Sequence, residues 1–272
     1  MKTLPSYIGP AAFGIKMGVF LPGSDLVGEI VKRARDCAQD GLLADGDVLC
    51  ITESVVARVQ GNIVSVEYVA QEIREKLGLS VESTVGVLFP ITSRNRFALI
   101  LESIALAVPE GKVIVQLNYP ADEVGNQTIG LDFLASLDLK EDYIPQEMLN
   151  GYTFVHPITK VDYVQYYKEV IAKTGATPEI IFSNNPQHIA RYSVDGVIVA
   201  DIHRRHRTLG ALKEVFSNCI TLQDICNSGL MRSDWGLLGS NMSSDGMLKL
   251  APRDGQQVVD EIQRAVYEET GK

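Results

Sequence analysis

The sequence predicts an α+β protein in which mixed β-sheets are packed against helices. Apolar runs of strand length are intermixed with amphipathic helical patterns along most of the chain, and the runs are bounded by turn-forming residues. Of the 272 residues, 46% are apolar, which is enough for a large core. This length fits a single domain over residues 1–272, or two lobes divided near residues 150–159. We find no internal repeat and no long low-complexity linker.

The first half of the chain opens with a helical pattern whose apolar positions lie on one face. Ser24 or Asp25 can cap this helix, and Gly41 can end it. An Asp-Gly turn then predicts a strand. The further elements predicted up to residue 118 are a short helix at 54–61, a strand at 62–67, a helix at 68–78, a strand at 85–90, a helix at 93–111 and a strand at 112–118; the earlier helix and strand lie at 26–40 and 45–52.

The second half continues the mixture. The apolar periodicity predicts a helix at 161–175, strands at 178–183 and 195–202, and a closing helix at 252–271. The stretch GSNMSSDG, residues 239–246, reads as a polar loop. The intermixing of predicted helices and strands along both halves of the chain is the basis of the α+β assignment.

Composition excludes several classes of function. The net charge is −9 with a pI near 5.0, which argues against nucleic-acid and membrane-surface partners. The N-terminus carries no signal-peptide pattern, no segment reaches the length of a membrane span, and the cysteines lack metal-ligand spacing. We therefore expect a cytoplasmic protein whose thiols are reduced. An anionic ligand would need a local basic group or a metal ion.

Polar clusters follow three of the predicted strands. They are Thr52-Glu53-Ser54, residues 118–126 and Ser183-Asn184-Asn185. Strand ends that open into polar loops commonly supply ligand groups, because the sheet fixes the backbone while the loop offers donors and acceptors. Each cluster taken alone can equally be a solvated turn.

Four stretches together resemble the coenzyme F420-0:L-glutamate (gamma-glutamyl) ligase family. The most specific is ADGDVLCITESVVARVQGN, residues 44–62, which resembles a strand and nucleotide-contacting segment of that family. GIKMGVFLPGSDLVGEIV resembles the family's opening loop and first helix, and KVIVQLNYPADEVGN resembles its metal-binding turn. KVDYVQYYKEVIAKTGATPEIIFSNN is similar to the helix and strand before a second metal-binding pair. The resemblance covers roughly residues 10 to 200.

This resemblance implies a two-lobed ligase-like fold and a nucleotide-dependent amide ligase. The family joins a carboxylate to an amino-acid amine through an acyl-phosphate, using GTP (or ATP) and Mg²⁺ or Mn²⁺, and it forms homodimers. Phosphorylation makes the carboxylate attackable, since oxide is a poor leaving group. The resemblance assigns Asp122 as catalytic and metal-binding, Asn184 and Asn185 to the second metal position, and the nucleotide to Ile15, Lys16, Met17, Glu53, Ser54, Arg58 and Asn126.

The sequence departs from the family at the second metal position. Asn184-Asn185 stands where the family has Asp-Thr, so a neutral amide replaces a charged ligand. Mg²⁺ and Mn²⁺ prefer anionic oxygen, and the loss should weaken metal binding. Arg58 stands in place of a lysine and presents a planar fork instead of a point charge. A scaffold that binds a nucleotide or an anionic metabolite without catalysis is therefore the alternative.

The run HRRHR after the strand at 195–202 is the densest positive charge in the chain. His203, Arg204 and Arg207 are the candidates for holding a phosphate or a carboxylate. An exposed basic turn and an Asp-His-His metal site with Asp201 are the other interpretations, although the arginines oppose a cation. Ser183 and His188 leave open an unrelated hydrolase, but no nucleophile elbow accompanies them.

Overall fold

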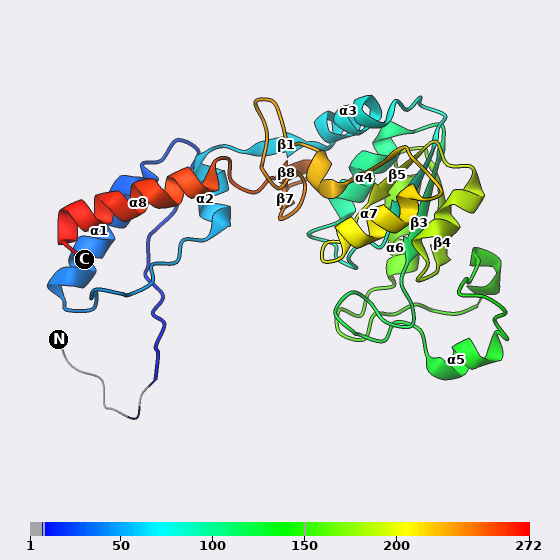
Figure 1. Cartoon of the computed structure of the whole chain (residues 1–272), viewed down its shortest axis with the longest axis horizontal. Coiled ribbons are helices and arrows are strands. Elements are labelled where there is room, and N and C mark those ends of the chain that lie inside the picture. The colour runs from blue at the N-terminus through cyan, green and yellow to red at the C-terminus, as the bar shows by residue number, and fades with distance from the viewer. Residues whose placement is uncertain (1–6, 8, 150) are drawn as a thin grey trace. The chain divides into compact units, whose positions relative to one another are not determined.

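The computed structural model describes residues 7, 9–149 and 151–272. Contacts between residues divide the chain into two compact units (Figure 1). Unit 1 comprises Met1–Asn62 and Ala251–Lys272, and unit 2 comprises Ile63–Leu250. The lobe boundary expected near residues 150–159 falls inside unit 2.

Unit 1 is built around a pair of helices from opposite ends of the sequence. Helix α1, Leu26–Gln39, packs along α8, Gly255–Thr270, and the short helix α2, Glu53–Val59, joins the same apolar cluster. The side chain of Asp25 accepts a hydrogen bond from the Gly28 amide and so caps α1, as the sequence predicts. The core of unit 1 therefore forms only when the N-terminal and C-terminal segments of the chain pack against each other.

The strand predicted at residues 45–52 is not formed. Val48 is 85% exposed and Leu49 is 44% exposed, so the apolar run lies largely in water. A strand needs a neighbour that accepts its backbone hydrogen bonds, and every strand in the described part of the chain belongs to unit 2. The run of apolar residues predicted a strand by local pattern alone, but the described residues of this unit contain no strand with which it could pair.

Unit 2 contains a parallel sheet of five strands, which runs in the order β4-β3-β2-β5-β6. The chain enters in the centre at β2, moves outward through β3 and β4, and returns to the other side of β2 for β5 and β6. The strand bounds are β2 Thr84–Leu88, β3 Lys112–Leu117, β4 Thr177–Phe182, β5 Gly196–Val199 and β6 Cys219–Thr221. All carboxyl ends of these strands meet at one edge, where open parallel sheets usually bind ligands.

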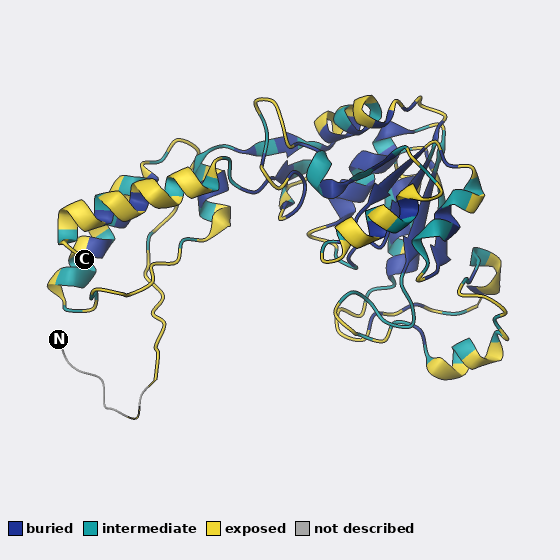
Figure 2. Cartoon of the chain, in the orientation of Figure 1, coloured by how far each residue is buried: buried dark blue, intermediate teal, exposed yellow. Residues whose placement is uncertain are grey.

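Helices cover both faces of this sheet, so its strands are buried on both sides (Figure 2). Helices α3, Val66–Leu77, α4, Ala98–Ala107, and α6, Tyr163–Ala172, contribute to the larger apolar cluster. On the other face lie the 3-10 helix η2, Pro186–Tyr192, and helix α7, Arg205–Lys213. Gly86 in β2 lets η2 approach, because a Cβ there would come within 2.6 Å of the Ile189 side chain. The predicted central strands are confirmed.

A second, antiparallel sheet in unit 2 corrects the loop predicted at residues 239–246. Strands β7, Asn241–Ser244, and β8, Met247–Lys249, form a hairpin, and β1, Ile63–Ser65, pairs with β8. Gly246 turns the hairpin with φ +67°, a value that glycine adopts without strain. The polar composition concealed a short strand pair, because no residue of β7 is buried. A parallel sheet, an antiparallel sheet and packed helices fit the expected α+β class.

Three shorter elements complete unit 2. They are helix α5, Leu131–Ser136, and the 3-10 helices η1, Gln146–Leu149, and η3, Leu222–Asp224. Within the described residues, no helix has both the length and the apolar character that crossing a bilayer requires.

Candidate functional site

A hollow opens at the carboxyl ends of β2, β3 and β4, and it has about 30 Å³ of room for water-sized molecules within about 430 Å³ of space that includes open solvent. Leu117, Phe154 and Phe182 form an apolar wall, and each is at most 6% exposed. The polar side chains that line the hollow are Thr92, Asn118, Asp122, Glu123, Thr128 and His156, while Pro90, Tyr163 and Val164 complete it. An apolar wall with a few convergent polar groups is typical of a small-molecule site.

Asp122 lies in the turn after β3, and its carboxylate is fully engaged. One oxygen accepts hydrogen bonds from the amides of Val124 and Asn126, at 3.1 and 2.7 Å. The other oxygen accepts from the side chain of Asn126 at 2.8 Å and contacts Nε2 of His156 at 2.9 Å. Burial alone would raise the pKa of Asp122, but these hydrogen bonds outweigh it and lower the pKa. The carboxylate therefore holds the turn together.

His156 is buried, and both of its ring nitrogens are occupied. Nδ1 accepts hydrogen bonds from the amides of Ile158 and Thr159, both at 3.2 Å, and Nε2 is therefore the nitrogen that donates to Asp122. The ring of Tyr163 meets the imidazole edge to face, with centroids 5.8 Å apart. His156 thus orients Asp122 and leaves no ring nitrogen free to take a proton from a ligand.

Glu123 is the second carboxylate that lines the hollow. It is half-buried, and burial is the main reason that its pKa is raised; the neighbouring Asp122 charge acts in the same direction. Hydrogen bonds from its own backbone and from the backbone of Thr92 lower the pKa in part. A carboxylate in this state is costly to keep charged without a ligand, so it favours a cationic partner.

Thr92 is held over the hollow by a buried tyrosine. The hydroxyl of Tyr167 donates to the carbonyl of Ile91 at 2.6 Å and accepts from the amide of Ser93 at 3.1 Å. Tyr167 is 0% exposed, and these two bonds fix the loop after β2 on both sides of Thr92. Oγ1 of Thr92 is buried and has no hydrogen-bond partner among the described residues. A buried hydroxyl without a partner calls for a water molecule or a ligand.

The metal expected at Asp122 does not fit the residues as they are arranged. Among the described residues, no group of three or more His, Cys, Asp or Glu side chains could hold a metal ion. Asn184 bonds through its amide to the carbonyl of Tyr119 at 2.9 Å and to Asp142, and Oδ1 of Asn185 caps η2 through the Gln187 amide. Both asparagines therefore serve the backbone of the loops that follow β3 and β4, and neither lines the hollow.

The basic run after β5 forms the start of helix α7. Asp201 accepts hydrogen bonds from the amide of Arg204 at 2.9 Å and from the hydroxyl of Thr208 at 2.9 Å. His203, Arg204 and Arg207 are exposed. They lie on the same edge of the sheet as the hollow, because the loops after parallel strands emerge together, but they do not line it.

The residues assigned to the nucleotide are divided between the two units. Ile15, Lys16, Glu53, Ser54 and Arg58 are exposed residues of unit 1, and Met17 packs partly against its core. Asn126 belongs to unit 2 and is bonded to Asp122. The nucleotide assignment stays a prediction.

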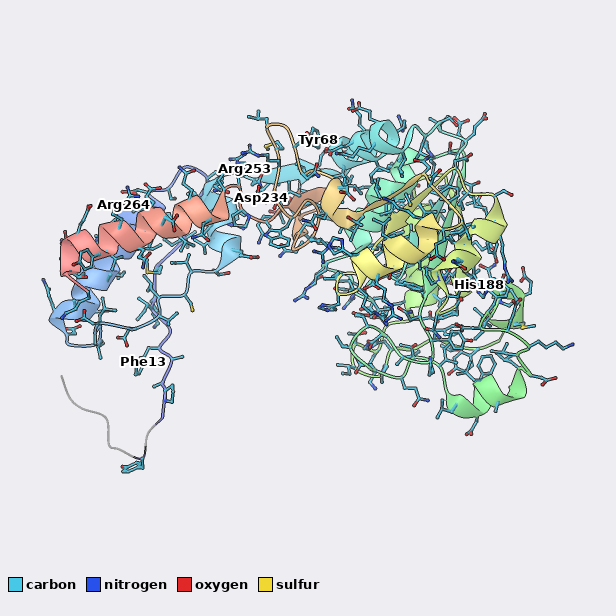
Figure 3. All side chains as sticks on the ribbon, viewed as in Figure 1. Phe13, Tyr68, His188, Asp234, Arg253 and Arg264 are labelled. Atoms are coloured by element: carbon cyan, nitrogen blue, oxygen red, sulfur yellow. The ribbon has the colours of Figure 1, made fainter. Side chains whose placement is uncertain are left out.

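Ser183 and His188, which suggested a hydrolase, form a buried pair. The Ser183 hydroxyl lies 2.7 Å from Nδ1 of His188, and the two residues are 0% and 6% exposed. His188 is labelled in Figure 3. Burial and the nearby Arg191 lower the pKa of His188. The Ser183 hydroxyl also accepts from the amide of Asn185 at 3.0 Å. This pair ties the end of β4 to η2, and its burial leaves no approach for a substrate.

Glu123, His156 and Thr92 are the members of the hollow that the sequence did not reveal as functional. Glu123 had one local signal, since it directly follows Asp122 in a turn after a strand. His156 lies 34 positions from the carboxylate that it contacts, so only the folded chain brings them together. Thr92 has no signature of its own.

Comparison with known proteins identifies the family. The family model described as F420-0:gamma-glutamyl ligase matches residues 14–272. No curated protein matches the chain. One solved structure, the calicheamicin methyltransferase CalS11, is similar at 11% identity over 76% of this chain and 80% of its own, with a TM-score of 0.29, which is too low to bear on fold or function. Because the family model matches nearly the whole chain, this protein belongs to the F420-0:gamma-glutamyl ligase family.

Proposed function

We propose that the protein is a nucleotide-dependent ligase that joins a carboxylate to the amine of a small molecule. The observation that carries this proposal is the hollow at the carboxyl ends of the parallel strands, which is lined by Glu123 and by an apolar wall. Such a site suits the acceptor, because it offers an anion for an amine and an apolar wall for the rest of the molecule. Family membership supports a ligase reaction.

Activation of the carboxylate by GTP or ATP is part of the proposal. A carboxylate resists attack by an amine, and an acyl-phosphate provides the leaving group that the reaction needs. Lys16, Ser54 and Arg58 keep the assignment to the nucleotide that the resemblance implies. Mg²⁺ commonly binds through one or two carboxylates together with substrate phosphates, so any metal dependence would come with the nucleotide phosphates and not from the occupied carboxylate of Asp122. The side chains of this chain bind and orient the substrates, and we assign no reaction step to a metal.

A second function, binding without catalysis, is favoured by one observation. Both oxygens of Asp122 are already used by hydrogen bonds within the protein, and Asn184 brings no charge. The same scaffold could then hold a nucleotide or an anionic metabolite without activating it.

Two measurements separate these functions. Melting temperature is followed while GTP or ATP is added with and without Mn²⁺, since a ligand of the folded state raises it by mass action. Phosphate release is then measured with nucleotide, L-glutamate and a panel of carboxylates. Nucleotide stabilisation with phosphate release supports the ligase. Stabilisation without release supports the binding scaffold, and no nucleotide effect would contradict both.

The nucleotide assignment has its own matched control. Arg58→Gln removes an exposed cation assigned to phosphate, and Arg264→Gln removes an exposed cation on α8 of the same unit (Figure 3). We expect weaker nucleotide stabilisation only for Arg58→Gln. Equal stabilisation in both variants would remove Arg58 from the site.

A further inference from the structure

The hollow has the charge of a cation site. Its ionisable lining consists of Asp122, Glu123, His156 and Tyr163, and no lysine or arginine is among the described residues that line it. Asp122 and His156 satisfy each other, at 2.9 Å. Glu123 is left as the charged group that a ligand can pair with, and its half-buried position strengthens its attraction for a cation over that of a fully solvated carboxylate.

Two threonines line the same hollow as Glu123. Thr92 is one of the lining residues, and its Oγ1 is buried without a hydrogen-bond partner among the described residues. Oγ1 of Thr128 donates to the carbonyl of Pro120 at 3.2 Å, which leaves its lone pairs free to accept. Glu123, Thr92 and Thr128 thus offer three acceptor groups in one hollow. A primary ammonium group has three N–H donors to match them.

The same lining disfavours a divalent ion. Mg²⁺ and Mn²⁺ are bound by several oxygen ligands, preferably anionic ones. Of the two carboxylates in the hollow, Asp122 has both oxygens occupied by hydrogen bonds, and Glu123 already accepts hydrogen bonds from backbone groups. The apolar wall of Leu117, Phe154 and Phe182 suits a hydrocarbon chain attached to the cation, whereas a bare metal ion gains nothing from it.

We propose that this hollow is a binding site for the primary ammonium group of an alkyl amine, with Glu123 as its counter-ion and with Thr92 and Thr128 as hydrogen-bond acceptors. The proposal rests on the proposed ligase function in one respect, because it takes the bound group to be the amine that the reaction acylates. The ammonium first gives one proton to Glu123; the neutral amine then attacks the acyl-phosphate, the C–N bond forms, and phosphate leaves with the second proton. Glu123 and Thr92 then determine acceptor specificity.

The test measures the binding of n-butylammonium to the full chain. Binding is monitored by saturation-transfer NMR in the absence of nucleotide. Tetramethylammonium has the same charge but no N–H donor, and it should bind at least tenfold more weakly. Glu123→Gln should lower the affinity for n-butylammonium about tenfold to a hundredfold, since a hydrogen bond to a charged group is lost. Thr92→Val should weaken it severalfold. Glu110→Gln changes an exposed carboxylate before β3, at the other edge of the sheet, and should have no effect.

Three results would overturn the proposal outright, and a fourth would replace the ammonium with a metal. The three are the absence of n-butylammonium binding, equal binding of tetramethylammonium, and full affinity in a folded Glu123→Gln variant. Displacement of n-butylammonium by Mn²⁺ in the wild type but not in Glu123→Gln would assign the site to a metal instead. Fluorescence of Trp235, the single tryptophan and a residue of unit 2, confirms that each variant is folded. The binding measurement contains no nucleotide, so its result does not depend on whether the protein catalyses ligation. The ammonium site and the ligase function are therefore tested separately.

Discussion

Replacing Asp122 with alanine should destabilise the metal-free protein. The carboxylate is 2% exposed and accepts hydrogen bonds from the amides of Val124 and Asn126, from the Asn126 side chain and from His156. A carboxylate reserved for a metal ion would behave in the opposite way, because its unpaired charge would destabilise the fold when the metal is removed. The sign of the change therefore distinguishes the two roles.

The expected size follows from the donors that lose their acceptor. A hydrogen bond to a charged group contributes about 1.5–3 kcal/mol. In the variant, however, the backbone donors of the loop can form hydrogen bonds with water instead. His156 is 5% exposed and cannot do so, and a buried donor left without a partner costs about 1–3 kcal/mol. We expect Asp122→Ala to lose about 3–5 kcal/mol of unfolding free energy in total. This is a large share of the 5–15 kcal/mol, roughly, that stabilise a typical domain.

The assay is urea unfolding at pH 7 after dialysis against EDTA, monitored by fluorescence of Trp235. Because Trp235 belongs to unit 2, the signal reports the unit that contains Asp122. Asp132→Asn, an exposed carboxylate in α5, is the control and should stay within about 0.5 kcal/mol of the wild type.

The pH dependence provides an independent check. The pKa of Asp122 is lowered in the folded state, so its contribution is present above its ordinary pKa of 3.8 and is lost as the pH falls through the folded value. The difference between wild type and Asp122→Ala should therefore shrink in acid. A variant as stable as the wild type, or more stable, in EDTA at pH 7 would refute this reasoning and restore Asp122 as a metal ligand.

Further predictions concern three other sites. Glu123→Gln should raise the unfolding free energy at neutral pH, because the folded pKa of Glu123 is raised; the gain should vanish below about pH 4.5, where both states are protonated. Gly236→Ala should unfold at markedly lower urea, since a Cβ would lie 2.4 Å from two backbone carbonyl oxygens, whereas Gly246→Ala meets open space and should cost only about 1 kcal/mol. A disulfide reagent should modify exposed Cys50 in the native protein and buried Cys226, whose pKa is raised by burial, only after unfolding.

Local periodicity was sufficient for the elements whose partners lie within the same pattern. The apolar faces of α1 and α3 and the continuous apolar runs of β2, β3 and β4 each marked an element at the correct place. Boundaries were less accurate where a cap decides them: the strand predicted at 62–67 ends at Ser65, because the Ser65 side chain accepts from the Tyr68 amide and starts α3.

The segment at 45–52 marks the limit of this reasoning. Its residues 48–51 form an apolar run like that of a buried strand, yet strand formation depends on a hydrogen-bonding neighbour that no local pattern specifies. The hairpin of β7 and β8 is the converse case, since a polar stretch becomes a strand pair when β1 supplies the neighbour.

The sequence by itself determined the class of this protein and its family, because helix and strand periodicity and the motifs between residues 10 and 200 are properties of neighbouring residues. It also marked Asp122 as a residue to watch. The tertiary structure decided what surrounds that carboxylate. His156, Thr92 and Glu123 reach the same hollow from different loops, and contacts between distant segments depend on how the chain packs, which no short stretch of sequence encodes.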